Sequence, residues 1–111
     1  MKRIICILAL VTALIPEISK AAAHTTTDGY ITYMEGGWAS GNLRVQTDFA
    51  FTNPANCSSP DGYITDPADS GSSLFNALLM NAYMSHKKVH LVLDGCTVGR
   101  PHIISVAVLS N

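Results

Sequence analysis

The sequence predicts a small, mainly β domain with one helix, and three observations support this. Residues 74–84 carry apolar side chains at steps of three and four, which is typical of an amphipathic helix. Residues 43–51 and 89–93 alternate between apolar and polar, and residues 102–109 form a nearly continuous β-branched and aliphatic run. The order strand, strand, strand, helix, strand, strand is that of a five-stranded OB-like barrel. The alternative is an open α+β sheet with the helix packed on one face.

Residues 1–23 have the features of a secretory signal peptide. A basic start precedes an apolar run over residues 4–15, and Ala21 and Ala23 have the spacing that a signal peptidase reads. The run is shorter than the roughly 20 residues of a membrane-spanning helix, which disfavours a retained membrane anchor. Cleavage after Ala23, or alternatively after Ala21, leaves residues 24–111 as a single domain. We therefore expect a secreted or periplasmic protein that does not insert into a membrane after cleavage.

Charge and cysteine content narrow the range of functions. Cleavage removes three of the seven basic and one of the eight acidic residues, which leaves four and seven and a net charge of −3. The domain then lacks the basic face that nucleic acids or anionic lipids need. Cys57 and Cys96 remain as an even pair in an oxidising compartment, so we expect a disulfide between them. Its closure stabilises a domain of this size by roughly 4 kcal/mol.

The first half of the predicted domain contains three strands. Residues 24–27 are expected to be a loose terminus, and a first strand follows at residues 30–34. After a glycine-rich connection, residues 43–51 form the second strand, and a short third strand lies at residues 63–65. One face of the second strand is expected to carry Leu43, Val45, Thr47, Phe49 and Phe51. The string Asp-Gly-Tyr-Ile-Thr occurs at residues 28–32 and 61–65, and we interpret it as one turn-into-strand solution used twice.

The second half contains the helix and two strands. Ser70, Ser72 and Ser73 offer side-chain acceptors for the first-turn amides of the helix. The fourth strand, residues 89–93, ends at a strong Asp-Gly turn signal. The fifth, residues 102–109, is so apolar that we expect it to be covered on both faces and central to the sheet, or packed under the helix. A turn near Val98 would place His90 opposite Val106 and Asp94 opposite His102.

Residues 70–109 contain several short motifs: Ser72-Ser73-x-Phe75, Leu78-Leu79, Ala82, Lys88-Val89-x-Leu91, Gly95-Cys96 and Pro101. Together they resemble the receptor-binding B subunit of subtilase cytotoxin and related small secreted bacterial proteins. The resemblance implies an OB-fold, assembly into pentameric rings, binding of sialylated glycans and a separate catalytic subunit. The first two strands do not align with the sugar-contacting positions of that family, so the resemblance carries over no binding residue.

The residues themselves offer candidate positions for ligand contact. Trp38 lies in the glycine-rich connection, where an exposed aromatic ring can cover the C–H face of a sugar. Tyr30, Asn42 and Arg44 are the other candidate glycan-binding residues. The alternative interpretation, which the sequence supports equally, is that Trp38 is buried at one end of the barrel or lies in an interface. Met80, Tyr83 and Met84 form either a subunit-facing strip on the helix or the edge of one wide core stripe.

These features favour a secreted, non-catalytic glycan-binding domain. The alternative is a periplasmic or secreted protein-interaction or inhibitor domain, and a small hydrolase comes third because no catalytic signature is present. The three histidines His86, His90 and His102 do not converge in this reading, so we expect neither a metal site nor a cofactor.

Overall fold

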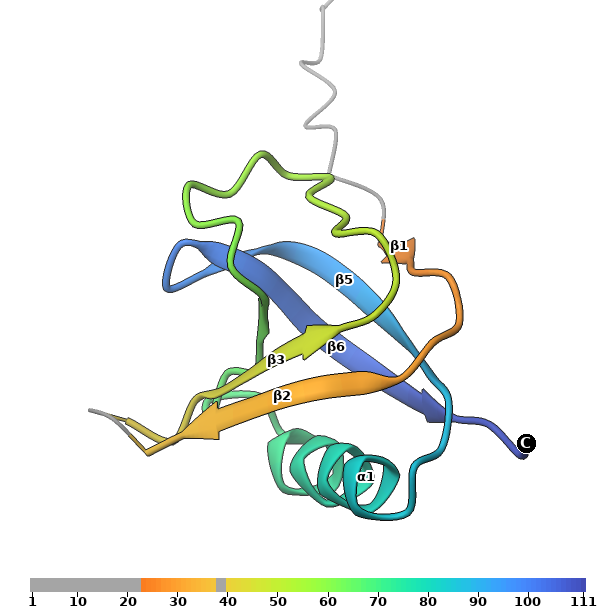
Figure 1. Ribbon diagram of the computed structural model, residues 1–111. Helices are drawn as coiled ribbons and strands as arrows, with labels where there is room; N and C mark the ends of the chain where they lie inside the picture. The colour runs from red at the N-terminus through yellow and green to blue at the C-terminus, as the bar shows by residue number, and fades with distance from the viewer. Residues whose placement is uncertain (1–22, 38–39) are drawn as a thin grey trace, which may run out of the picture.

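The computed structural model describes residues 23–37 and 40–111, which form six strands and one helix (Figure 1). The elements are β1 (His24–Thr25), β2 (Ile31–Gly36), β3 (Leu43–Thr47), β4 (Tyr63–Ile64), α1 (Ser72–Met84), β5 (Val89–Thr97) and β6 (Arg100–Val108). The predicted signal peptide falls outside the described residues except for its last position. Among the described residues, no helix has the length and hydropathy needed to cross a membrane.

The strands form one mixed sheet in the order β1-β5-β6-β4-β3-β2, in which only the β4–β6 pair is parallel. The prediction of a mainly β fold with one helix between the third and fourth predicted strands is confirmed. The prediction of a closed five-stranded barrel is wrong, and the open α+β sheet describes the structure better. The two edge strands, β1 and β2, follow each other in the chain, and in the part of the chain described here no ladder joins them.

Residues 26–30 explain why the two edge strands, β1 and β2, do not pair with each other. The prediction of a loose terminus at residues 24–27 is wrong, because His24 and Thr25 pair with β5. The Thr26 amide donates to the Leu91 carbonyl at 2.8 Å, and the Thr26 hydroxyl accepts from the Leu91 amide at 3.0 Å. A single bridge from Gly29 to Val89 follows before the chain turns away to β3. The backbone hydrogen bonds of this segment are thus divided between the two edges of the sheet.

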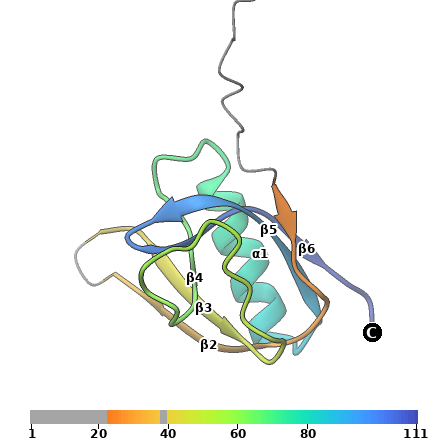
Figure 2. The same ribbon diagram turned by 90° about the horizontal axis from the view of Figure 1, so that it is seen from above.

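The core lies between the sheet and α1, which packs beneath the sheet when seen from above (Figure 2). Leu79 and Ala82 are the buried helix residues. The buried side chains that surround them are Ile31, Val45, Tyr63, Val89, Leu91, Leu93, Ile103 and Val106. Leu74, which the apolar spacing placed on the stripe, is 60% exposed. Met80, Tyr83 and Met84 are also exposed. The helix therefore carries a buried face and an exposed apolar face.

The helix begins without the predicted serine caps. Gly71 occupies the cap position with no side-chain hydrogen bond to the first turn, and its carbonyl accepts from the Phe75 amide at 2.9 Å. At the other end, the Lys87 amide donates to the Ala82 carbonyl at 2.9 Å, and His86 adopts a positive φ of 49°. Backbone contacts rather than serine side chains therefore define both ends of α1.

The β5–β6 hairpin is longer than predicted and contains bulges. Strand β6 lies between β5 and β4, which confirms its central position, but Ser105 and Val108 are exposed, so the prediction that both faces are covered is wrong. His90 pairs with Ala107 and Leu93 pairs with Ile103, so the predicted pairing of His90 with Val106 is wrong by one residue. The register shifts between Val92 and Leu93 and again before Cys96. A bulge changes which residues face the core, and its position could not be read from a continuous apolar run.

Strand β3 is shorter than the predicted segment of residues 43–51. It ends at Thr47, because the Asp48 amide donates to the Tyr30 carbonyl at 3.0 Å and the Asp48 carboxylate accepts from the Tyr30 amide at 2.8 Å. Val45 is fully buried as predicted, whereas Phe49 and Phe51 lie in the following loop. The alternation predicted the start of this strand but not its end.

Candidate binding site

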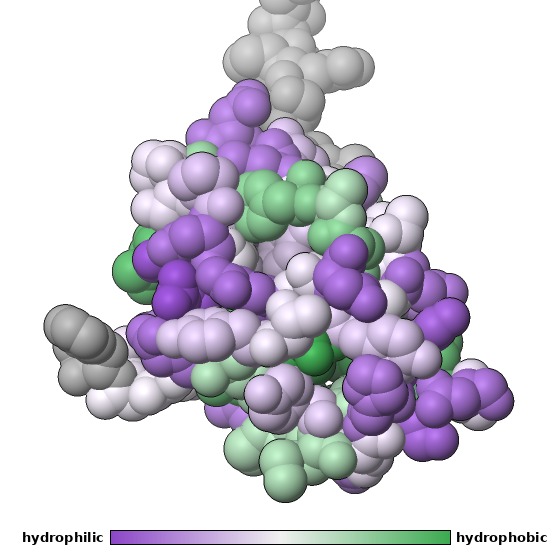
Figure 3. Space-filling view, in the orientation of Figure 1, coloured by the Kyte–Doolittle hydropathy of each residue, from purple (hydrophilic) through white to green (hydrophobic). Residues whose placement is uncertain are grey.

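An open cavity of about 460 Å³ lies at one end of the sheet, beside the tip of the β5–β6 hairpin. Polar and apolar surface contribute about equally to its lining, which consists of Glu35, Gly36, Ser40, Asn42, Arg44, Asp61, Ile64, Val98 and Arg100. In Figure 3, hydrophilic residues gather in this part of the surface. The cavity is built by the ends of β2, β3 and β6 together with the loop that leads into β4.

Arg44 is the central cation of the cavity. It pairs with Glu35 across the antiparallel β2–β3 ladder, so their side chains emerge beside each other. The guanidinium lies 3.1 Å from the Glu35 carboxylate and 3.0 Å from the Asp61 carboxylate. Its carbon is 5.2 Å from the centre of the Tyr33 ring. Contacts on three sides hold this cation in place within the cavity wall.

Asp61 connects Arg44 to a second arginine. Arg100 approaches the Asp61 carboxylate with two nitrogens, at 2.6 Å and 3.0 Å, in a fork-like contact. The same guanidinium donates to the Val98 carbonyl at 3.0 Å. Gln46 donates to the Asp61 backbone carbonyl at 3.0 Å. The cavity wall thus carries two arginines and two carboxylates, and its formal charge is balanced.

The network keeps both carboxylates ionised. Hydrogen bonds from Tyr33 and then from Arg44 lower the pKa of Glu35. Hydrogen bonds from Arg100 lower the pKa of Asp61. The hydrogen bond that the Tyr33 hydroxyl donates to Glu35 raises the pKa of Tyr33. At neutral pH the cavity therefore presents fixed acceptors next to fixed cationic donors.

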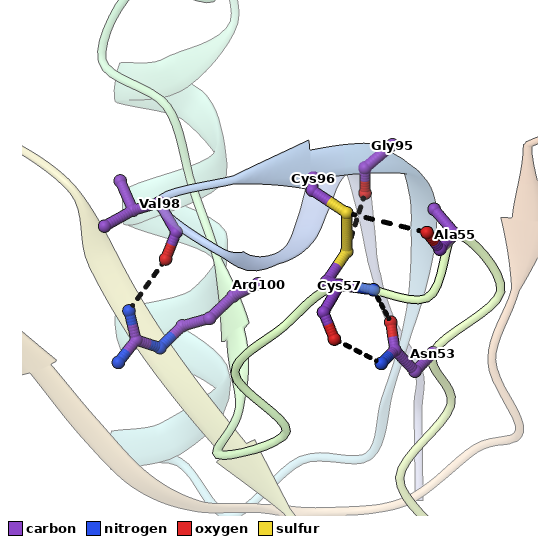
Figure 4. The surroundings of a disulfide bond; sticks show 7 residues. All are labelled: Asn53, Ala55, Cys57, Gly95, Cys96, Val98 and Arg100. Carbon is purple, nitrogen blue, oxygen red and sulfur yellow. Dashed lines mark hydrogen bonds between the residues drawn. A yellow bond between two sulfur atoms is a disulfide. The ribbon is translucent and has the colours of Figure 1, made fainter.

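The disulfide joins the loop that leads to Asp61 with the β5–β6 hairpin. Cys57 and Cys96 are bonded, with their Cα atoms 5.7 Å apart, which confirms the predicted pair (Figure 4). The Asn53 side chain donates to the Cys57 carbonyl and accepts from the Cys57 amide, at 2.9 Å and 2.8 Å. The Ser59 amide donates to the Gly99 carbonyl at 2.8 Å. These contacts attach the loop that contains Asp61 to the hairpin that contains Arg100.

A second, smaller cavity of about 210 Å³ adjoins the first and shares Asp61 with it. Its wall includes Phe49, Phe51 and Tyr63. The rings of Phe51 and Tyr63 stack with their centres 5.1 Å apart, and Phe51 remains 38% exposed. An aromatic surface thus continues directly from the charged cavity.

Of the four candidate residues predicted from the sequence, the structure brings Asn42 and Arg44 together in the large cavity. Asn42 donates to the Thr65 carbonyl at 2.7 Å. Tyr30 lies beyond the opposite end of β2, where its ring stacks on His86 with the ring centres 4.1 Å apart. Trp38 lies outside the described residues.

Sequence reasoning missed Glu35, Asp61 and Arg100. Glu35 and Asp61 stand in segments that were interpreted as connections, and Arg100 was interpreted as part of a turn. The cross-strand neighbour of Arg44 was the one available signal for Glu35, since opposite charges pair across strands. The approach of Asp61 to Arg100 spans 39 residues and depends on the disulfide-linked loop.

The comparisons with known proteins add no family to this geometry. A scan against family models, a search of curated proteins and a search of solved structures each found no match. The function is therefore argued from the site itself.

Proposed function

We propose that the chain is a secreted, non-catalytic binding domain that recognises cell-surface glycans through the cavity around Arg44. The observation that carries this proposal is the open, charge-balanced cavity of about 460 Å³, lined by Asn42, Arg44 and Arg100. A cavity of this size suits a small ligand, and its few convergent polar groups suit one with many hydroxyl groups.

The chemistry of the wall supports a sugar. Arg44 and Arg100 offer N–H donors, Glu35 and Asp61 offer carboxylate acceptors, and Asn42 offers both. Sugar hydroxyls donate and accept, so they can bridge neighbouring groups of both kinds. The partly exposed Phe51 beside the cavity can pack against the C–H face of a ring, the role that we expected of Trp38.

The same network favours binding over hydrolysis. A glycosidase needs one carboxyl group whose raised pKa lets it donate a proton. In this cavity hydrogen bonds lower the pKa of both Glu35 and Asp61, which is the opposite of the shift that such an acid needs. This supports the non-catalytic part of the proposal.

The test is a glycan-array screen of the oxidised chain comprising residues 24–111, followed by titration of each hit. Arg44→Gln and Arg100→Gln should each weaken binding by about tenfold or more, since each removes a charged donor from the wall. Lys88→Gln is the matched control, because it makes the same charge change at an exposed residue outside the cavity. Urea unfolding of each variant distinguishes lost binding from lost folding.

Trp38→Ala extends the same test. Its neighbours in the sequence, Gly36 and Ser40, both line the cavity. Loss of glycan binding with unchanged stability would make Trp38 a sugar platform, and unfolding would make it a core residue. A folded protein that binds no glycan on the array would refute the proposed function.

The second candidate function is a protein-interaction or inhibitor domain, and the exposed face of α1 favours it. Leu74 and Met84 are 60% and 81% exposed, and Figure 3 shows hydrophobic residues over this helix. Burial of this face against other copies would produce an oligomer, and the family resemblance favours a pentameric ring with a separate catalytic subunit. Light scattering of the oxidised protein tests assembly, and Met84→Lys should return an oligomer to monomers.

A further inference from the structure

His102 of β6 lies beside two aspartates from the turn that joins β4 to α1. Ile64 pairs with His102 across the parallel β4–β6 ladder, so the residues that follow β4 come next to this histidine. One donor atom from each of Asp66, Asp69 and His102 lies within 4.8 Å of the other two, and all three residues are half-buried. The fold thus gathers one imidazole and two carboxylates from two separate segments.

The backbone of the turn positions both aspartates. The Asp66 carboxylate accepts from the Ala68 amide at 2.9 Å through one oxygen. The Asp69 amide donates to the Asp66 carbonyl at 3.1 Å. One oxygen of Asp69 lies 2.6 Å from Nε2 of His102. Each carboxylate therefore retains an oxygen that these contacts do not occupy.

The charge of this cluster differs from that of the binding cavity. Glu35 and Asp61 each have an arginine partner. Within the described ranges 23–37 and 40–111, no lysine or arginine lies within 4.0 Å of the Asp66 or Asp69 carboxylate. The two neighbouring carboxylates repel each other, and a divalent cation would offset that repulsion.

We propose that Asp66, Asp69 and His102 bind a zinc ion, with water completing the coordination. Zinc takes imidazole nitrogen and carboxylate oxygen at about 2.0–2.2 Å in a tetrahedral arrangement, which sets its ligand atoms about 3.4 Å apart. The donor atoms of Asp69 and His102 lie 2.6 Å apart, and all three donor atoms lie within 4.8 Å of one another, so the proposal requires the Asp69 and His102 side chains to move slightly apart. The imidazole favours zinc over calcium or magnesium, which prefer oxygen ligands.

A second aspartate–histidine pair provides an internal contrast. Nδ1 of His90, on β5, lies 3.1 Å from the Asp28 carboxylate, and in the part of the chain that the structure describes no second acidic ligand joins this pair. The two pairs therefore have the same residue types and differ in the number of convergent acidic ligands. A protein that binds zinc through any exposed histidine would not distinguish them.

The experiment is calorimetric titration of ZnCl₂ into the untagged, oxidised, chelator-treated chain comprising residues 24–111. We expect one zinc ion per chain and a rise in the melting temperature of about 5 °C or more at 100-fold excess over the dissociation constant. His102→Gln and Asp66→Asn should each weaken binding at least tenfold. Asn at position 66 can still accept from the Ala68 amide, so this variant keeps the turn. His90→Gln is the matched control and should bind as the wild type does.

Equal zinc affinity in wild type, His102→Gln and Asp66→Asn would overturn the proposal and assign the metal to other histidines. Tighter binding of CaCl₂ than of ZnCl₂ would overturn the choice of zinc. None of the three proposed zinc ligands lines the cavity around Arg44, so the result of the zinc titration does not depend on the proposed glycan binding.

Discussion

The two Asp-Gly-Tyr-Ile-Thr segments have identical sequences and very different surroundings. In the second segment Tyr63 is 1% exposed and belongs to the core, whereas Tyr30 of the first is half-buried and stacks on His86. Asp61 binds two arginines in the cavity wall, whereas its counterpart Asp28 lies beside His90.

The difference comes from the strands on either side. The second segment forms β4, between β3 and β6 in the middle of the sheet, and both of its edges are paired. The first crosses from one sheet edge to the other and enters β2, an edge strand. The isoleucine is buried in both copies, at 6% and 4% exposure. A local sequence thus placed its isoleucine in the core twice, while the environment of the other residues depended on their neighbours.

The largest expected difference in the free energy of unfolding is between variants of Tyr63 and Tyr30. Tyr63→Ala should lower the free energy of unfolding by about 3–5 kcal/mol, because it leaves a cavity in the core and removes the acceptor of the Thr52 amide. Tyr30→Ala should cost about 1 kcal/mol, mainly from its stacking on His86. Urea unfolding of both oxidised variants measures the two losses. Equal losses would show that the first copy carries as much of the core as the second.

The glycines should show the next largest difference. Gly62 has a φ of +136°, and a Cβ there would lie 2.8 Å from the Val45 carbonyl oxygen, so Gly62→Ala should cost about 2–3 kcal/mol. At Gly29 the added Cβ meets side-chain atoms of Asp48 and Phe49 rather than backbone, so Gly29→Ala should cost less, about 1 kcal/mol. Thermal unfolding ranks the two. A larger loss at Gly29 would mean that the Asp48 and Phe49 side chains cannot adjust.

The threonines should differ by less. Thr65 is buried and its hydroxyl accepts from the Leu43 amide at 2.9 Å, so Thr65→Val should cost about 1–2 kcal/mol by leaving that amide unpaired. Thr32 is exposed, and Thr32→Val should change stability by less than about 0.5 kcal/mol. Amide hydrogen exchange at Leu43 gives a direct readout. Unchanged protection of that amide in Thr65→Val would contradict the assigned hydrogen bond.

The aspartates give the smallest effect, which depends on pH. Because the folded state lowers the pKa of Asp61, its stabilising contribution is present above the unfolded pKa, near 4, and is lost as the pH falls through the lower folded value. Asp61→Asn should remove about 1 kcal/mol or less at pH 7, since these ion pairs are partly exposed to solvent. The variant should also show a flatter loss of stability below pH 4. Asp28→Asn keeps the Asp61 ion pairs and is the control, and an equal flattening there would rule out Asp61 as the source.

Part of the fold could be predicted because its signals are local. The apolar spacing of residues 74–84 predicted the helix, and an even pair of cysteines after a predicted signal peptide predicted the disulfide. The ladders are not local. The pairing of His24 with Leu93 and the bulges of the β5–β6 hairpin each depend on a partner strand that has no signal in the segment itself. The barrel prediction failed for this reason.

The candidate site divides in the same way. Asn42 and Arg44 were accessible to sequence reasoning, because alternation places Arg44 on the polar face of a strand. Asp61 and Arg100 were not, because the disulfide and the Ser59–Gly99 hydrogen bond bring their segments together. The convergence of Asp66 and Asp69 on His102 depends likewise on the parallel pairing of β4 with β6.

The sequence by itself determined that residues 74–84 lie in a helix, that a strand begins at Leu43 and that Cys57 pairs with Cys96. These properties follow from spacing and composition over a few residues. Only the tertiary structure decided which strands are neighbours, and therefore which charged groups meet. Contacts across 33 to 39 residues, such as those of Asp69 with His102 and Asp61 with Arg100, arise from the whole sheet. Identical pentapeptides acquired different environments because strand pairing, rather than local preference, sets the partners of each side chain.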